Sequence, residues 1–192
     1  MKSAGELPRV GISSCLLGEE VRYDGRHKRA PWLFAVDALL VEWVAVCPEV
    51  EVGMGVPREP VQLVTPGADI IGSTRTRVIG VVSGADWTAR MDAWARRRLR
   101  ELGALDLSGY VLKARSPSCG PAAVPVHASE GQSGEYVKEG RGIFADALMA
   151  AMPGLPIADD ESLRDPDARR AFFVRVSDYR SGAAATGQPH RP

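Results

Sequence analysis

Short apolar runs recur along the chain, and longer segments with helical apolar spacing separate them. Continuous apolar runs of this kind suit strands that are buried on both faces of a parallel sheet. We therefore predict strands at residues 8–14, 43–47, 109–113 and 155–159.

The longer segments predict helices. The clearest spans residues 85–102, where apolar residues such as Met91 and Leu99 recur at helical spacing and Gly103 follows as a stop. We predict further helices at residues 31–42, 141–152 and 161–180. Strands that alternate with helices indicate an α/β fold with a mainly parallel central sheet flanked by helices. We expect one domain over residues 1–180.

Segments rich in glycine, proline and serine interrupt this pattern. We predict a long loop at residues 48–67, a short hairpin or a strand and turn at 68–83, a mobile surface loop at 128–140 and a disordered tail at 181–192.

Charge and composition narrow the function classes. The chain has 24 basic and 24 acidic residues, a balance that argues against extensive nucleic-acid binding. The sequence shows neither a signal-peptide pattern nor an apolar stretch long enough for a membrane span. We therefore expect a cytoplasmic protein without a membrane partner. Three cysteines are an odd number, which makes a disulfide framework a poor explanation for them.

The cysteines share one local setting. Cys15, Cys47 and Cys119 each follow a short apolar strand and enter a turn. Ligands of open parallel α/β sheets bind outside the carboxyl ends of the strands, so the three thiols can meet there. Alternatively, each cysteine packs separately as a small apolar residue. Three thiolates suit a soft metal or an iron–sulfur cluster, and a four-iron cluster with three protein ligands leaves one iron open to act as a Lewis acid.

Four motifs carry a resemblance. The segments SSCLLGEEVRYDGRHKR (13–29), VCPEVEVGMGVPREP (46–60), LKARSPSCGP (112–121) and GRGIFADALM (140–149) resemble the bacterial thiouracil desulfidase family, long catalogued as a domain of unknown function. The stretch LRDPDARRAFFVRVSDYR resembles the junction to a second domain in some relatives. The chain therefore looks like a form without this C-terminal accessory domain.

The resemblance implies a function and a site. It implies an α/β domain whose 4Fe-4S cluster is held by Cys15, Cys47 and Cys119, with one iron not bound by protein. It implies that the enzyme replaces the thiocarbonyl sulfur of a thiolated pyrimidine, thiouracil or its nucleotide, with oxygen and without net redox change. It also assigns catalytic roles to Glu49 and Ser116.

The chemistry of the reaction suits the side chains of these two residues. Replacing C=S by C=O requires a base that takes a proton from water, and a carboxylate in a partly dry cleft such as that of Glu49 can do so. Ser116 can donate or relay a hydrogen bond to the substrate. The structural alternative for Ser116 is a hydroxyl that caps the turn before Pro117.

Five further residues are candidates for substrate binding. Tyr23 and Asp24 can form a wall of the substrate pocket, with Tyr23 stacking on a base, although Tyr23, Asp24 and Gly25 also form a typical turn sequence, the reading we favour. The other candidates are basic residues that can offer charge to a phosphate or an anionic cluster: Arg58, Lys113 and Arg115.

A second class of function stays open. The cysteines can instead hold a zinc ion or a cluster in a non-catalytic binding module for redox sensing or sulfur delivery. Thiolated RNA is an alternative substrate, although the neutral charge favours a small molecule. The sequence does not indicate an oligomeric state.

Overall fold

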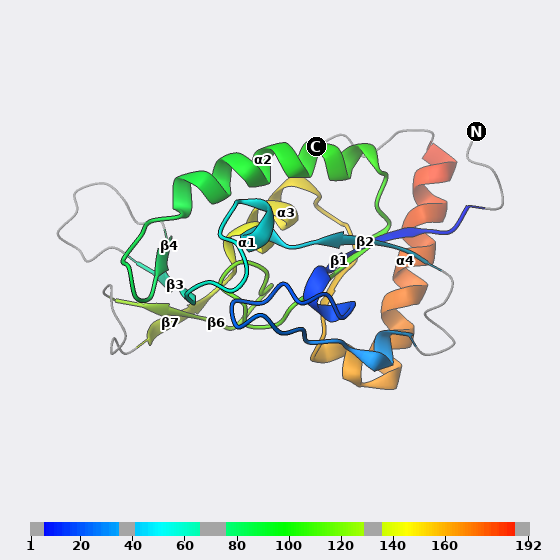
Figure 1. Cartoon of the computed structure of the whole chain (residues 1–192). Helices are drawn as coiled ribbons and strands as arrows, with labels where there is room; N and C mark the ends of the chain where they lie inside the picture. Colours follow the sequence, from blue (N-terminus) through cyan, green and yellow to red (C-terminus); the bar gives the residue numbers. More distant parts are fainter. Residues whose placement is uncertain (1–5, 35–40, 66–75, 129–135, 187–192) are drawn as a thin grey trace.

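A computed structural model describes residues 6–34, 41–65, 76–128 and 136–186 (Figure 1). Four parallel strands form the first sheet, in the order β2-β1-β5-β8. These strands are β1 (Arg9–Ser13), β2 (Glu42–Val46), β5 (Gly109–Leu112) and β8 (Ile157–Asp159). All four strands predicted from apolar runs are therefore confirmed, and so is the α/β class.

The parallel sheet is covered on both faces, as its apolar strands require. Val10 and Ile12 of β1 pack with Phe172 of α4 (Pro166–Thr186) on one face. Tyr110 and Leu112 of β5 point to the opposite face, because side chains alternate along a strand. There they pack with α2 (Thr88–Ala104) and α3 (Ile143–Ala151). Within the described residues, no helix is long and apolar enough to cross a membrane.

A second, mixed sheet lies beside the first, and the sequence pattern did not predict it. Its strand order is β4-β3-β6-β7, in which only β3 and β6 run parallel. The strands are β3 (Val61–Val64), β4 (Arg77–Gly80), β6 (Val124–His127) and β7 (Tyr136–Gly140). Helix α2 extends along both sheets, and its buried residues share one core with strands of each (Figure 1).

Several predicted loop and helix limits are wrong. The predicted loop 48–67 contains α1 (Pro48–Glu51) and β3, and the predicted loop 128–140 contains β7, with 129–135 outside the described residues. Of the predicted helix 31–42, Pro31–Phe34 forms a 3-10 turn, Glu42 instead pairs with Arg9 in the sheet, and residues 35–40 lie outside the described residues.

The C-terminal region and the segment 68–83 agree in part. Pro166–Thr186 forms α4, preceded by a 3-10 turn at Ser162–Arg164. Residues 181–186 thus continue the helix where a disordered tail was predicted, and 187–192 lie outside the described residues. In the segment 68–83, β4 is followed by a turn at 81–83, which fits the strand-and-turn alternative, and residues 68–75 lie outside the described residues. The helices predicted at 85–102 and 141–152 are confirmed as α2 and α3.

Gly11 in β1 lets the ring of Tyr110 lie directly over the strand. A Cβ atom at residue 11 would overlap that ring, which is fully buried. We expect Gly11→Ala to lower the free energy of unfolding by about 3 kcal/mol, the upper part of the usual range for overpacking. Urea unfolding measures this, with Gly103→Ala as the control, since its Cβ meets only a methionine methyl at 3.8 Å. Equal stability of both variants would contradict the packing.

Candidate active site

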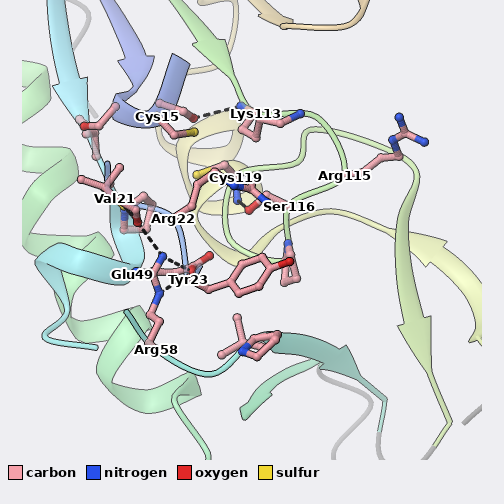
Figure 2. Close-up of a pocket in the computed structure, with 18 of the residues that line it drawn as sticks. Cys15, Val21, Arg22, Tyr23, Glu49, Arg58, Lys113, Arg115, Ser116 and Cys119 are labelled. Carbon is pink, nitrogen blue, oxygen red and sulfur yellow. Dashed lines mark hydrogen bonds and ion pairs between the residues drawn. The ribbon is translucent and has the colours of Figure 1, made fainter. Parts of the chain in front are cut away.

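A cavity of about 210 Å³ opens at the carboxyl ends of β1, β2 and β5 (Figure 2). The sheet order places these three strands next to one another, so their ends meet at one edge. Its walls include Cys15, Cys47, Cys119, Glu49, Ser116 and Lys113. The structure therefore brings the predicted cysteine ligands and the two predicted catalytic residues to one place.

Two of the cysteines sit where a strand turns into a helical turn. Cys15 lies in the 3-10 turn Ser14–Leu16 that follows β1 directly. Cys47 is the residue between β2 and α1, whose first position is proline, a residue suited to a helix start. The backbone N–H of Cys47 donates a hydrogen bond to Glu51 Oε1 at 3.2 Å. Short local elements thus fix both backbones at the cavity.

Cys119 lies on a loop that is held by Ser116 and by helix α3. Ser116 Oγ accepts hydrogen bonds from the backbone N–H groups of Ser118 and Cys119 at 3.3 and 3.1 Å. The first amides of α3 donate to the carbonyls of Pro117 and Ser118. Ser116 therefore caps the turn, as the structural alternative predicted. Both contacts use its oxygen as acceptor, so its hydroxyl proton can still donate within the cavity.

Gly142 allows α3 to approach this loop closely. A Cβ atom there would lie 2.6 Å from the Ser118 carbonyl oxygen and 2.8 Å from the Cys119 nitrogen. Backbone atoms cannot yield as a flexible side chain does, so Gly142→Ala must displace the Cys119 loop. We expect at least a ~10-fold loss of bound iron, comparable to losses from disturbed support of metal ligands. Iron analysis tests this against Gly182→Ala, where a Cβ meets open space; equal iron contents would contradict it.

Without a bound metal, the environment of the three thiols disfavours their charged forms. Burial raises the pKa of the Cys15 thiol to about 12, and the neighbouring Cys47 adds to the rise. Burial also raises the pKa of Cys47, and it raises the pKa of Cys119 far more, again with help from Cys47. Metal binding requires deprotonated thiols, and a bound cation supplies the compensating charge.

This donor set fits an iron–sulfur cluster. In the described part of the chain, no group of three His, Cys, Asp or Glu side chains is placed to hold a single metal ion. The thiols instead stand around a cavity. A four-iron cluster takes each thiolate on a different iron, so its cysteines surround it rather than converge on a point. Soft thiolates are also the ligands such clusters use.

Thiol reactivity of the cluster-free protein tests this electrostatic description. Only the thiolate reacts with iodoacetamide, and a raised pKa lowers its population. With a pKa of about 12, roughly 10⁻⁴ of Cys15 is ionised at about pH 8, against roughly a quarter for an ordinary thiol with a pKa near 8.5. We expect alkylation of Cys15 to be about 10³-fold slower than in urea, as measured by peptide mass spectrometry. Equal rates would contradict the burial of this thiol.

Glu49 faces the cavity with both carboxylate oxygens engaged. Oε2 accepts hydrogen bonds from Arg58 Nη2 and Nε at 2.6 and 2.9 Å, and Oε1 accepts one from Ser118 Oγ at 2.9 Å. Arg58 also donates to the backbone carbonyls of Gly55 and Val21. Arg58 therefore holds the orientation of Glu49 in this structure, and its contact with a phosphate stays a prediction.

Of the other predicted substrate-binding residues, some line the cavity and one does not. Tyr23 and Arg115 line the cavity, but Arg115 is exposed and paired with Glu161. Tyr23 is 40% exposed at the cavity mouth, with the guanidinium of Arg22 over its ring. Asp24 is absent from the cavity walls, which lie within the described residues. It accepts a hydrogen bond from the Arg26 N–H, so the turn reading fits this residue better than substrate binding.

Sequence reasoning missed two polar residues of the site. Ser118 donates to Glu49, and buried Asp160 binds Lys113. Ser118 had a usable signal, since it stands between two residues that the motif SPSCGP had already singled out. Asp160 had none, because its partners lie 46 and 47 residues away in the chain.

The fold and the cavity together define a class of protein: an α/β protein with a thiol-lined cavity at the carboxyl edge of its parallel sheet. The chain belongs to the 2-thiouracil desulfurase family, whose sequence model matches residues 10–160.

Individual relatives agree with this membership. The chain is similar to the uncharacterized protein YbbK of Bacillus subtilis (strain 168), with 36% identity over 112 residues, 57% of this chain and 71% of that protein. It is also similar to the solved structure of the [4Fe-4S]-dependent thiouracil desulfidase TudS, with a TM-score of 0.62 and 29% identity over 87% of this chain and 99% of that one.

Proposed function

We propose that this protein is a 4Fe-4S-dependent desulfidase that replaces the thiocarbonyl sulfur of a thiolated pyrimidine, thiouracil or its nucleotide, with oxygen. One observation carries the proposal: three cysteines from separate segments and the carboxylate of Glu49 line the same cavity. The similarity to TudS, a protein named for this cofactor and activity, supports it.

The proposed reaction balances without an electron donor. Water adds its oxygen to the carbon that carries sulfur, the carbon–sulfur bond breaks, and both protons of the water leave with the sulfur as hydrogen sulfide. No atom changes its oxidation state. The chain therefore has to bind the substrate, remove protons from water and accommodate sulfide.

Cys15, Cys47 and Cys119 hold the cluster in this proposal. When bound, the cluster supplies an iron without a protein ligand, which can act as a Lewis acid toward sulfur. Three thiols that line one cavity fit such a group, and none of the three cysteines is in a disulfide.

Glu49 is the proposed base. Each carboxylate oxygen has more than one acceptor site, so Glu49 can bind a water molecule while Arg58 and Ser118 hold its orientation. A proton of the water passes to the carboxylate as the water oxygen approaches the substrate carbon. The free hydroxyl proton of Ser116 can bind a ring nitrogen or oxygen, and Tyr23 can cover the ring at the mouth.

The test is sulfide release by anaerobically reconstituted protein. We expect 2-thiouracil, 4-thiouracil or a corresponding nucleotide to yield sulfide and the oxygenated base in equal amounts, measured by chromatography and a sulfide assay. A protein that binds iron and leaves all of these compounds intact would overturn the substrate class. Tightly bound zinc without iron–sulfur absorbance would instead favour the non-catalytic binding module. Turnover of thiolated RNA alone would point to the RNA alternative.

A further inference from the structure

A buried ion pair between Lys113 and Asp160 forms part of the cavity's surroundings. Lys113 Nζ donates to both carboxylate oxygens of Asp160 at 3.0 Å. The side chains of Lys113 and Asp160 are 15% and 6% exposed, and Lys113 lines the cavity. The sequence offers Lys113 as one of several basic residues that can give charge to a phosphate or to an anionic cluster, and it indicates no role for Asp160.

Asp160 is fixed firmly enough to position its partner. Its Oδ1 accepts a second hydrogen bond, from the Ala114 N–H at 2.7 Å. Its own backbone N–H donates to Leu112 O, and its carbonyl accepts from the indole of Trp32. These contacts tie the residue after β8 to the end of β5, where Lys113 begins the loop that leads to Cys119.

Lys113 lies at the Cys15 end of the cavity (Figure 2). Its backbone N–H donates to Ser13 Oγ at 3.0 Å, two residues before Cys15. Lys113 lines the cavity together with Cys15, whereas Asp160 is not among the described residues that line it. The ammonium is therefore the nearer of the two charges to the cavity.

The fold alone does not require this arrangement. A buried ion pair is weak support for stability, because apolar residues of similar volume often do as well. Three thiolates, by contrast, bring negative charge into a buried place that needs a counter-charge. The other cations that line the cavity also have carboxylate partners: Arg58 pairs with Glu49, Arg22 with Asp24 and Arg115 with Glu161. Lys113 differs from them because it lies at the Cys15 end of the cavity (Figure 2).

We propose that the Lys113 ammonium is the counter-charge that stabilises the anionic cluster at its Cys15 side, and that Asp160 is the residue that positions it. The inference rests on the proposed cluster, but it does not depend on the substrate. Because the reduction potential of a cluster depends on nearby charge, the pair should set that potential.

The test is the potential of the reconstituted cluster, followed by absorbance during an anaerobic redox titration without substrate. Lys113→Met removes a positive charge, so reduction becomes harder and the potential should become more negative. Asp160→Asn removes a negative charge and keeps an acceptor for Ala114, so the potential should become more positive. The double variant should lie between wild type and Lys113→Met, because the lysine charge is the nearer of the two to the cavity.

Two further variants separate charge from shape. Lys113→Arg keeps the charge and should keep the potential close to wild type. Glu161→Gln makes the same chemical change next to Asp160 on an exposed side chain, where solvent screens it, and should leave the potential unchanged. If Lys113→Met does not retain iron, Asp160→Asn still tests the proposal through its positive shift, with Lys113→Arg as the variant expected to stay close to wild type. Shifts of Lys113→Met and Asp160→Asn in the same direction, or none in Asp160→Asn, would overturn the proposal.

The outcomes also separate this inference from the proposed function. Opposite shifts in a protein that releases no sulfide from thiolated pyrimidines would uphold the charge role and refute the activity. Unchanged potentials in an active enzyme would uphold the activity and refute the charge role.

Discussion

Replacing Glu49 by glutamine is expected to lower kcat for sulfide release by about 10²- to 10⁴-fold, the range that proton transfer by a positioned group contributes. Glutamine has nearly the same shape, and its amide oxygen can accept from Arg58 while its NH2 group donates to Ser118 Oγ. It cannot take a proton from water. Initial rates on reconstituted protein measure the change, and iron content and cluster absorbance should match wild type.

Two additional variants make this result specific. Ser118→Ala removes one of the groups that orient the carboxylate, and we expect a smaller loss of about 10-fold, as for support residues around a site. Glu20→Gln makes the same chemical change on an exposed glutamate and should be silent. A Glu49→Gln enzyme within threefold of wild type, with its cluster intact, would remove Glu49 as the base and leave water activation to another group.

The strands that could be predicted from the sequence are those with continuous apolar runs. β1, β2, β5 and β8 were found because strands buried on both faces carry such runs. The second sheet was not predicted because its strands lie in segments rich in proline and glycine. β6 even contains Pro125, a residue that argues against a strand on local grounds. It forms through pairing with distant β3, which local pattern does not reveal.

A similar limit applies to the helix predicted at 31–42. Its apolar spacing favours a helix, but Glu42 lies opposite Arg9 in the parallel sheet. Strand pairing here overrides local spacing at the end of the segment, as tertiary contacts commonly do. Only Pro31–Phe34 keeps a helical turn among the residues of this segment that the structure describes.

The site also has a part that the sequence predicts and a part that it does not. Cysteines at strand ends can be placed from sequence, because parallel strands deliver their carboxyl ends to one edge. The partners that orient the polar groups cannot, since Arg58 reaches Glu49 through a separate loop and Asp160 reaches Lys113 from another strand. Arg58 was expected to meet substrate, whereas in the structure it holds the carboxylate and the backbone of Val21.

Removing one cluster ligand should abolish both the cofactor and the activity. We expect Cys119→Ala to lose the iron–sulfur absorbance and at least about 10³ in kcat/KM, since Lewis-acid stabilisation is worth several kcal/mol and each 1.36 kcal/mol is tenfold. The loop itself should survive, because Ser116 caps it through the backbone N–H of residue 119, which alanine keeps.

Chelation distinguishes a lost ligand from a damaged fold. A group that binds only the folded chain raises its stability, so an iron chelator should lower the unfolding midpoint of reconstituted wild-type protein. The same chelator should not move the midpoint of Cys119→Ala, and chelated wild type should unfold within about 1.5 kcal/mol of that variant, as expected for a modest change at a well-supported buried site. A variant that keeps its iron and responds to the chelator like wild type would show that Cys119 is not a ligand, and the catalytic proposal would then have only two thiolates to hold its cofactor.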